Sequence, residues 1–439
     1  MSQDMTEGAI TRTLISFAVP LMFSNLLQQL YNWADALIVG NFLGEGALAA
    51  VGTTGAISGI LITVLVGFSV GVSILTAQRY GSGERSDLGK ILALFVILLG
   101  GAGVLVAILG YFLVGPLLML LHTPQDVLPV AAMYLRLILI GIPFLAVYNV
   151  YSAVLRGIGD SRTPLLAIFI SSVVNITLVY FFIARLGYGV EGAACATVIS
   201  QVLMTVFIMI YTRSRHASLR FQLSAGIFDS ATLASSLKLS LPTAAQAAVR
   251  SLGNMMLQQV MNSFGSQTVA AITTAYRIDS IGLLPVSGLG AAISTFAAQN
   301  KGAAKENRAN EGLIICIKLA CGVALGITLV VTLAGNALLS LFGMAAETVA
   351  IGQGVLLRLA VFYPLYGLLS SLSGYLQGMG DVRFVAYATI GALGVRIGFS
   401  YLLAPLFGNM VVAYAEAFSW IFQAGICYLR LRQFKAQQA

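Results

Sequence analysis

The sequence predicts an all-α integral membrane protein of twelve transmembrane helices, arranged as two six-helix lobes. Three observations predict this fold class: long apolar stretches, basic residues gathered in alternate connections, and a series of motifs that occurs twice. Of the 439 residues, 58% are hydrophobic and only 9% are charged. A water-soluble domain carries about 25% charged residues, because its surface faces water. We therefore expect the lipid bilayer to surround this chain.

The apolar stretches divide the chain into two halves. A helix needs about 20 apolar residues to cross the hydrocarbon core, and stretches of this length occur six times in each half. The more polar residues 213–236 are predicted to form a cytoplasmic linker between an N-terminal lobe, residues 1–212, and a C-terminal lobe, residues 237–439. The predicted spans lie near residues 13–40, 47–78, 91–118, 129–155, 164–185, 190–212, 237–264, 268–299, 312–342, 349–376, 384–405 and 409–431.

The net charge of +8 comes largely from short connections between these spans. In one set of alternate connections the only basic residue is Arg185. By the positive-inside rule, this asymmetry predicts a multi-pass protein of the plasma (cytoplasmic) membrane with both termini in the cytoplasm. The orientation of the chain in the membrane therefore accounts for the excess of basic residues, and nucleic acid is not an expected partner. The opposite set of connections holds Arg79, Arg85, Lys90, Arg156, Arg162, Arg213, Arg215, Arg220, Lys238, Lys301, Lys305, Arg308 and Arg383.

The two halves repeat one another. Gly157-Ile-Gly-Asp-Ser-Arg162 is matched by Gly378-Met-Gly-Asp-Val-Arg383 at an offset of 221 residues, and Pro143 is matched by Pro364 at the same offset. An ordered series of matches at a nearly constant offset indicates a duplication. Because each repeat has an even number of spans, both copies enter the membrane from the same side. The lobes are then expected to be related by a pseudo-two-fold axis along the membrane normal.

This architecture favours a secondary transporter over an enzyme, a receptor or a scaffold. Parallel-repeat transporters place the substrate path between their two repeats, whereas a receptor or a scaffold has no evident use for the duplication. The chain lacks the Gly-x-x-x-x-Gly-Lys-Ser/Thr motif, so ATP is not the expected direct energy source. The four cysteines lie in apolar stretches without metal-ligand spacing, and we expect no disulfide, metal site or other cofactor.

Several segments together resemble the multidrug and toxic compound extrusion (MATE) family. In the first span they are Pro20, Tyr31 and Asp35, followed by Val39-Gly-Asn-Phe-Leu-Gly44; the others are Gly159-Asp-Ser-Arg-Thr-Pro164 and Ala298-Gln-Asn-Lys-Gly302. The resemblance covers the whole chain. It implies a monomeric antiporter that exports organic cations and drugs in exchange for sodium ions or protons. It also implies a V-shaped central cavity between the two lobes.

Asp35 is a candidate for ion coupling on physical grounds as well. A carboxylate in hydrocarbon costs several kcal/mol unless it is neutralised, hydrated or paired. Tyr31 lies one turn earlier on the same helix face, and an acid beside a phenol can exchange a proton or coordinate a cation. In the alternative interpretation, Asp35 lies near the outer interface and caps the helix. Leu37-Ile-Val39, which follows it, favours coupling.

The resemblance implies partners for Asp35 on the fifth and sixth spans. In the family, an acid of this kind joins an Asn and a second acid on helix 5 and a Thr on helix 6; here Asn175 and Thr197 match. The second acid would fall at position 179, where this sequence has Val179. An oxygen cage with one carboxylate holds sodium less strongly than one with two. The single carboxylate favours coupling to protons, and both the proton and the sodium ion remain candidates for the coupling ion.

Pro20 lies in the middle of the first span, 15 residues before Asp35. A proline inside a helix removes a hydrogen bond and bends the helix. The resemblance links this bend to closure of the ion site. A static kink explains Pro20 equally well.

The second lobe carries more intramembrane charge. Under the repeat alignment, Arg396 takes the place of Asn175 and Glu416 that of Thr197, so the two are predicted to form a buried ion pair. The pair either fixes two helices or takes part in coupling. Asp279 does not share a helix face with Arg277, and we expect it to pair with Arg250.

The leading hypothesis is a proton- or sodium-coupled antiporter that exports amphipathic or cationic compounds by alternating access. The alternative is a flippase or exporter of lipid-linked or other amphipathic precursors in the same superfamily, which would have a more basic central cavity. The excess of arginine over acid in the second lobe keeps this alternative open.

Overall fold

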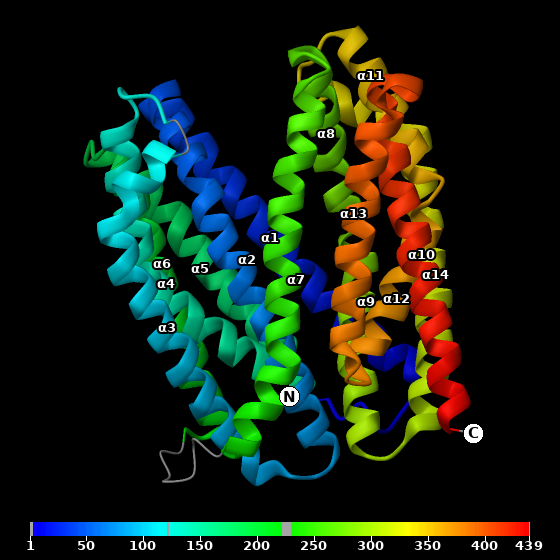
Figure 1. Cartoon of the computed structure of the whole chain (residues 1–439). Coiled ribbons are helices and arrows are strands. Elements are labelled where there is room, and N and C mark those ends of the chain that lie inside the picture. The colour runs from blue at the N-terminus through cyan, green and yellow to red at the C-terminus, as the bar shows by residue number, and fades with distance from the viewer. Residues whose placement is uncertain (1–2, 121–122, 222–229, 439) are drawn as a thin grey trace. The chain divides into compact units, whose positions relative to one another are not determined.

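The computed structural model describes residues 3–120, 123–221 and 230–438, and within these ranges every regular element is a helix (Figure 1). Part of the predicted linker, residues 222–229, lies outside the described residues. The first half holds α1 (Ile10–Leu43), α2 (Glu45–Gly81), α3 (Arg85–Leu120), α4 (Leu128–Gly157), α5 (Arg162–Tyr180) with the π-helical turn η1 (Phe181–Arg185), α6 (Val190–Arg215) and the short turn η2 (Ala217–Leu219). The second half holds α7 (Ser230–Asn262), α8 (Ser266–Gly282), α9 (Leu284–Gly302), α10 (Glu306–Ser340), α11 (Ala346–Ala360), α12 (Tyr363–Gly378), α13 (Val382–Phe407), the turn η3 (Gly408–Met410) and α14 (Val411–Gln438).

Each predicted span corresponds to one of these helices or to a bent pair. By length and composition alone, eight described helices can cross a membrane, or ten if each bent pair forms one span. The difference from twelve has two sources. The eight count α13 and α14 as one stretch, Val382–Ala436, and they do not include α7, which carries Lys238, Arg250 and many serine and glutamine residues.

Two spans of the second half are bent where their counterparts in the first half are continuous. Helices α8 and α9 meet at 45°, and α11 and α12 meet at 51°. Pro285 and Pro364 stand in the first turn of α9 and of α12. Proline lacks the backbone N–H that would continue the preceding helix, and its fixed φ suits a helix start. Helix α2, with Val64 at the position that matches Pro285, runs without a break.

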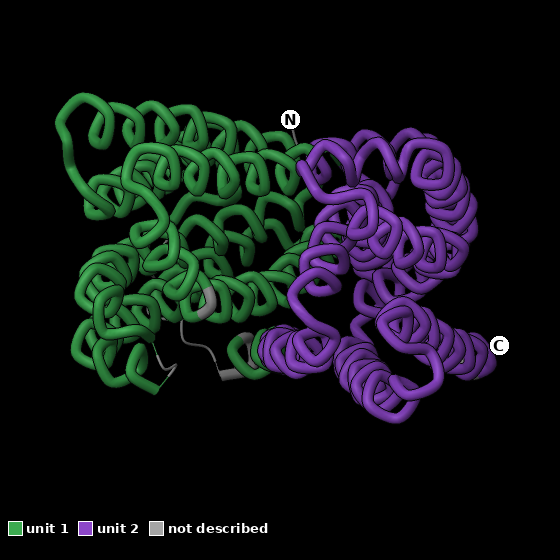
Figure 2. The backbone as a smooth tube through the Cα atoms, turned by 90° about the horizontal axis from the view of Figure 1, so that it is seen from above, with its two compact units in different colours: residues 1–3, 23–240 green, residues 4–22, 241–439 purple. Residues whose placement is uncertain are grey.

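The chain forms two compact units (Figure 2). Unit 1 consists of residues 1–3 and 23–240, and unit 2 consists of residues 4–22 and 241–439. The division falls inside α1, so the first part of this helix packs with the second half of the chain. The sequence-based division had assigned residues 4–22 to the N-terminal lobe.

The two units share one packing pattern. In unit 1, α4 packs against α2, α3 and α6, and α5 packs on α6. In unit 2, α12 packs against α9, α10 and α14, and α13 packs on α14. These are the helices that the repeat alignment pairs, so the duplication seen in the motifs is also present in the fold.

Gly157 and Gly378, the first glycines of the repeated motif, allow two helices to approach closely. A β-carbon on Gly157 would lie 2.9 Å from the Ser73 carbonyl oxygen on α2, and one on Gly378 would lie 2.2 Å from the Ser294 carbonyl oxygen on α9. Small residues at such contacts are typical of membrane helices, because packing rather than water exclusion holds the helices together.

The second glycines of the motif, Gly159 and Gly380, turn the chain with φ of 84° and 85°. L-residues with a side chain rarely adopt this conformation. The aspartates that follow contact residues from the last span of their half. His216 Nε2, directly after α6, lies 3.2 Å from Asp160, and Arg430 Nε on α14 donates to Asp381 at 2.6 Å.

Asp160 is held in its charged form. Burial alone would raise the pKa of its carboxyl, but the hydrogen bonds with His216 and Thr163 keep this pKa below its ordinary value. The repeated motif therefore has a structural role in each unit.

Candidate functional site

A polar network inside unit 1 links α1, α5 and α6. The Tyr31 hydroxyl donates to Thr197 Oγ1 at 3.4 Å, and Asn175 Nδ2 donates to the same oxygen at 3.3 Å. The Thr197 hydroxyl donates in turn to the Ala193 carbonyl at 3.0 Å. Three of the four residues predicted for ion coupling are therefore connected through Thr197.

Asp35, the fourth residue, follows Tyr31 by one turn in the same helix. Helix α1 continues to Leu43, more than two turns past Asp35, so Asp35 does not cap the helix end. Its charge lies within electrostatic range of the hydroxyls of Tyr31 and Tyr134.

Two acceptor oxygens of this site lack hydrogen-bond partners within the described part of the chain. They are Oδ1 of Asp35 and Oδ1 of Asn175, and both atoms are buried. An unpartnered buried acceptor costs about 1–3 kcal/mol. A proton on the carboxyl group, or a cation beside it, would remove part of this cost.

Position 179 contributes no oxygen to the site. Val179 is fully buried in an apolar cluster with Val39 and Ile183. Across the described ranges there is no group of three or more histidine, cysteine or acidic side chains that could hold a metal ion. The unit 1 site therefore offers one carboxylate, with amide and hydroxyl groups around it.

Sequence reasoning missed Tyr134, which α4 brings close to Asp35 and Tyr31. A tyrosine in an apolar helix is ordinary, and the local sequence carries no signal that marks this one. Only the packing of α4 within unit 1 places it there.

The predicted ion pair of unit 2 is present: Arg396 on α13 pairs with Glu416 on α14, with side chains 17% and 15% exposed. Arg396 Nη2 also donates to the Tyr276 hydroxyl at 3.2 Å, and its guanidinium lies 5.7 Å from the centre of that ring. In unit 1 the matching Asn175 and Thr197 are hydrogen-bonded. The duplication therefore brings a polar pair together at the same place in each unit.

The predicted pairing of Asp279 with Arg250 is wrong. Neither side chain forms an ion pair with any described residue. Oδ1 of Asp279 is buried without a hydrogen-bond partner among the described atoms, and Tyr363 is a close neighbour. Helix periodicity gives the face on which a residue lies but not the distance between two helices, so this pairing could not be derived from spacing.

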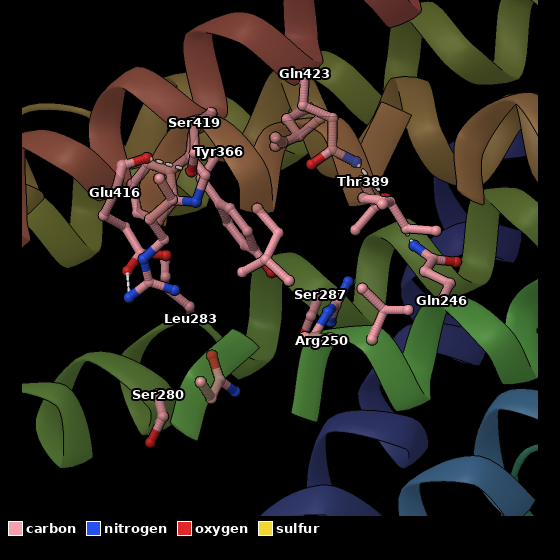
Figure 3. A pocket seen from close by; sticks show the side chains of 18 of the residues that line it. Gln246, Arg250, Ser280, Leu283, Ser287, Tyr366, Thr389, Glu416, Ser419 and Gln423 are labelled. Atoms are coloured by element: carbon pink, nitrogen blue, oxygen red, sulfur yellow. Dashed lines mark hydrogen bonds and ion pairs between the residues drawn. The ribbon is translucent and has the colours of Figure 1, made fainter. Parts of the chain in front are cut away.

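Arg250 and Asp279 instead line one cavity inside unit 2, of about 360 Å³ (Figure 3). Arg396 and Glu416 belong to the same lining. At one side, Gln246 and Gln423 each donate to Thr389 Oγ1 at 2.7 Å. Arg277, on the same helix as Asp279, is exposed and does not line this cavity.

Pro20 is buried within α1, which continues on both sides of it. The boundary between the two units falls between Met22 and Phe23, next to this proline. The helix segment that holds Tyr31 and Asp35 therefore belongs to unit 1, and the segment that holds Pro20 belongs to unit 2.

Comparison with known proteins gives one consistent result. The sequence profile of the MatE family matches residues 20–181 and again residues 242–402, once in each half. The probable multidrug resistance protein YpnP of Bacillus subtilis (strain 168) is 30% identical over 439 residues, which cover 99% of this chain and 98% of that protein.

Solved structures agree with this result. An outward-facing multidrug resistance MATE family transporter of the MOP superfamily superposes with a TM-score of 0.93 at 25% identity, covering 100% of this chain and 99% of that one. A MOP superfamily transporter from Pyrococcus furiosus Vc1 (DSM3638) superposes with a TM-score of 0.89 at 26% identity, covering 98% and 97%. That protein is described as having a binding pocket of reverse polarity, which suggests a different function for it.

Proposed function

The chain belongs to the MatE family of multidrug efflux transporters, and from this premise we propose that it exports cationic or amphipathic organic compounds in exchange for a coupling cation. Members of the family are membrane transporters, not enzymes, and need no cofactor. The proposal places a monomer in the lipid bilayer of the cytoplasmic membrane with both termini inside. The charge asymmetry of the connections supports this orientation.

One observation carries the coupling role: the Asp35 carboxylate has a buried, unpartnered oxygen beside the Tyr31–Thr197–Asn175 network. A carboxylate in such surroundings has two states that differ in solvation. When charged, it needs water or a cation; when protonated, it is tolerated in an apolar environment. Proton uptake and release at Asp35 would therefore favour different arrangements of the helices around it.

We propose the proton as the coupling ion. Val179 removes the second carboxylate that a sodium site would use, and the valine side chain packs in an apolar cluster. One carboxylate with neutral oxygens is a weak sodium ligand set but suffices for proton binding.

We propose that α1 bends at Pro20 and so connects this site to the segment of the helix that packs in unit 2. A proline inside a helix leaves one carbonyl without its intrahelical partner, which lowers the cost of bending. We propose that the charge state of Asp35 biases this bend, so that ion binding and substrate release alternate.

The test is a drug-accumulation assay in cells that lack their own efflux pumps. With the protein expressed, cells should accumulate less of a cationic dye than vector controls. A proton uncoupler should abolish this difference, and replacing sodium with potassium should leave it in place. Efflux that survives the uncoupler and stops without sodium would reject the proton as coupling ion.

The alternative, export or flipping of lipid-linked precursors, requires a basic cavity for an anionic headgroup. Arg250 and Arg396 line the unit 2 cavity, but Asp279 and Glu416 line it as well. The charges are balanced in number, which favours the drug exporter. In proteoliposomes, flipping of a polyprenyl diphosphate without drug-stimulated proton movement would favour the alternative.

A further inference from the structure

We propose that Arg136 and Tyr111 form a binding site for the phosphate of an anionic phospholipid, on the face of unit 1 where α3 lies beside α4. The outer leaflet supplies this lipid, which follows from the orientation of the chain proposed above. Contact with the lipid depends neither on that orientation nor on the coupling role of Asp35.

Arg136 is a charged residue on an exposed face of α4 that is otherwise apolar. Met133, Ile140 and Phe144 are exposed on the same face, at the spacing of one side of a helix. Helix α3 packs along α4 (Figure 1) and adds further exposed apolar side chains, namely Val104, Leu105, Ile108, Leu109 and Phe112. A surface of this composition on a membrane-spanning helix faces lipid.

The guanidinium of Arg136 lies over the ring of Tyr111, whose centre is 5.2 Å away. Among the residues that the structure describes, Arg136 forms no ion pair and no hydrogen bond. Stacking on a ring leaves the N–H groups at the edge of a guanidinium for other acceptors. A cation in hydrocarbon is costly unless an anion or polar groups satisfy it, so these donors need an acceptor.

The matching arginine of unit 2 has such acceptors within the protein. Arg358, the counterpart of Arg136 in the repeat, donates from Nε to the Tyr414 hydroxyl at 3.1 Å and from Nη1 to the Gly354 carbonyl at 2.8 Å. In unit 1 the repeat alignment places Cys195 where unit 2 has Tyr414, so the matching hydroxyl is absent. The two units therefore differ in that only one arginine is left for a ligand.

Arg136 lies at the depth where lipid headgroups begin. It is about 12 Å along the axis from the start of α4 at Leu128, and Tyr111 is about 13 Å from the end of α3 at Leu120. The 30 residues of α4 span about 45 Å, the thickness of a bilayer with its headgroups, and the hydrocarbon core takes about 30 Å of this. The Arg136 backbone therefore lies about 5 Å inside the hydrocarbon, from where an arginine side chain extends to the phosphate layer. Tyrosine is also typical of this level.

Charge and shape select an anionic phospholipid. Arginine binds two phosphate oxygens through parallel N–H groups, and the Tyr111 hydroxyl can donate a further bond. Since Arg136 has no acidic partner among the described residues, the site complements a headgroup of net negative charge better than one in which an ammonium balances the phosphate. Helix α4 runs inward from Leu128, so Ile140 and Phe144 lie deeper than Arg136 and offer a surface to the acyl chains. A free phosphate ion would leave this apolar surface unused.

The test uses a reporter tryptophan on this face and lipids with brominated acyl chains, which quench tryptophan fluorescence on contact. Ile140→Trp is introduced into the full-length protein together with Trp33→Phe and Trp420→Phe, which removes both native tryptophans. The protein is reconstituted into phosphatidylcholine nanodiscs. Brominated phosphatidylglycerol should then displace phosphatidylcholine from the reporter more readily than brominated phosphatidylethanolamine does.

Variants of the site identify the group that binds. Arg136→Gln should lower the affinity for phosphatidylglycerol at the reporter by about tenfold, because a charge-assisted hydrogen bond contributes about that much. Arg136→Lys should retain part of the affinity, since it keeps the charge but not the planar fork. Arg185→Gln, which removes an exposed basic residue elsewhere in unit 1, should leave the affinity unchanged. Thermal melting verifies that these variants fold.

A second reporter provides the matched control in unit 2. Leu333 is exposed on α10 at the position that matches Tyr111, and Leu333→Trp in the same tryptophan-free background should show no preference for phosphatidylglycerol. Equal preference at both reporters, or a preference that survives Arg136→Gln, would overturn the proposal. So would equal affinity for the two brominated lipids, or displacement of the lipid by inorganic phosphate. Asp35→Asn should keep the lipid preference while losing efflux, so the lipid site and the coupling role are tested separately.

Discussion

Two pairs of residues, Asn175 with Thr197 and Arg396 with Glu416, occupy matching positions of the two repeats. The same fold positions hold a neutral hydrogen-bonded pair in one unit and an ion pair in the other. The repeat alignment sufficed to predict this pairing from the sequence, because helix neighbours are the same in both units. It could not supply Tyr276, whose matching position in the first half is Gly55.

The ion pair gives a prediction for stability. Arg396→Ala and Glu416→Ala should each lower the free energy of unfolding by about 3–5 kcal/mol, since the remaining charge stays buried without its partner. The double substitution should cost less than the sum of the two, because no unpaired charge remains. Thermal or denaturant unfolding of the four proteins in detergent measures this coupling. Strictly additive losses would contradict an energetic link between the two groups.

At the scale of the element, single glycines allow close contacts between helices and single prolines stand where helices break. The sequence shows where these residues are but only partly shows which of them have this effect. Glycine at 157 and 378 repeats in the sequence, and the structure gives the reason: each faces a backbone carbonyl of a neighbouring helix. The bends at Pro285 and Pro364 were not predicted. Pro143 matches Pro364 yet lies inside the continuous α4, so proline alone does not determine a break.

The contact between α9 and α12 can be tested at Gly378. Gly378→Ala should lower the free energy of unfolding by about 1–3 kcal/mol, since the new β-carbon would meet the Ser294 carbonyl and push the helices apart. Gly394→Ala on α13 is the matched control, because no atom lies within 4 Å of its added β-carbon. Melting temperatures of the two purified variants provide the comparison. If both melt alike, the contact is not as close as described.

At the scale of the whole molecule, composition and duplication together predicted the membrane class, the division into spans and the repeated packing pattern, but not the breaks that turn two spans of the second half into bent pairs. The boundary between the two compact units could not be predicted from the sequence, because it falls inside α1, which is one continuous helix. Hydropathy cannot reveal such sharing, because it marks the whole helix from Ile10 to Leu43 as one candidate span. The unit 2 cavity was likewise hidden, as its lining comes from six helices far apart in the sequence.

Alternating access predicts that the units move relative to one another during transport. Spin labels at Ser82, after α2, and at Ala303, after α9, report on the corresponding connections of the two units. The distance distribution between them should shift between low and high pH, and again on adding substrate. The same pair in Asp35→Asn should lose the pH response and keep the substrate response. A single distance under every condition would argue against such movement.

The central claim, that Asp35 couples proton movement to export, is tested most directly in proteoliposomes that contain a pH-sensitive dye. Addition of a cationic substrate to the wild type should dissipate an imposed pH gradient, because each substrate is exchanged for protons. Asp35→Asn should fold and bind substrate but leave the gradient intact, since an amide does not change charge. Glu45→Gln, which alters an exposed acid at the start of α2, should behave as the wild type. Substrate-driven proton movement that persists in Asp35→Asn would contradict the account.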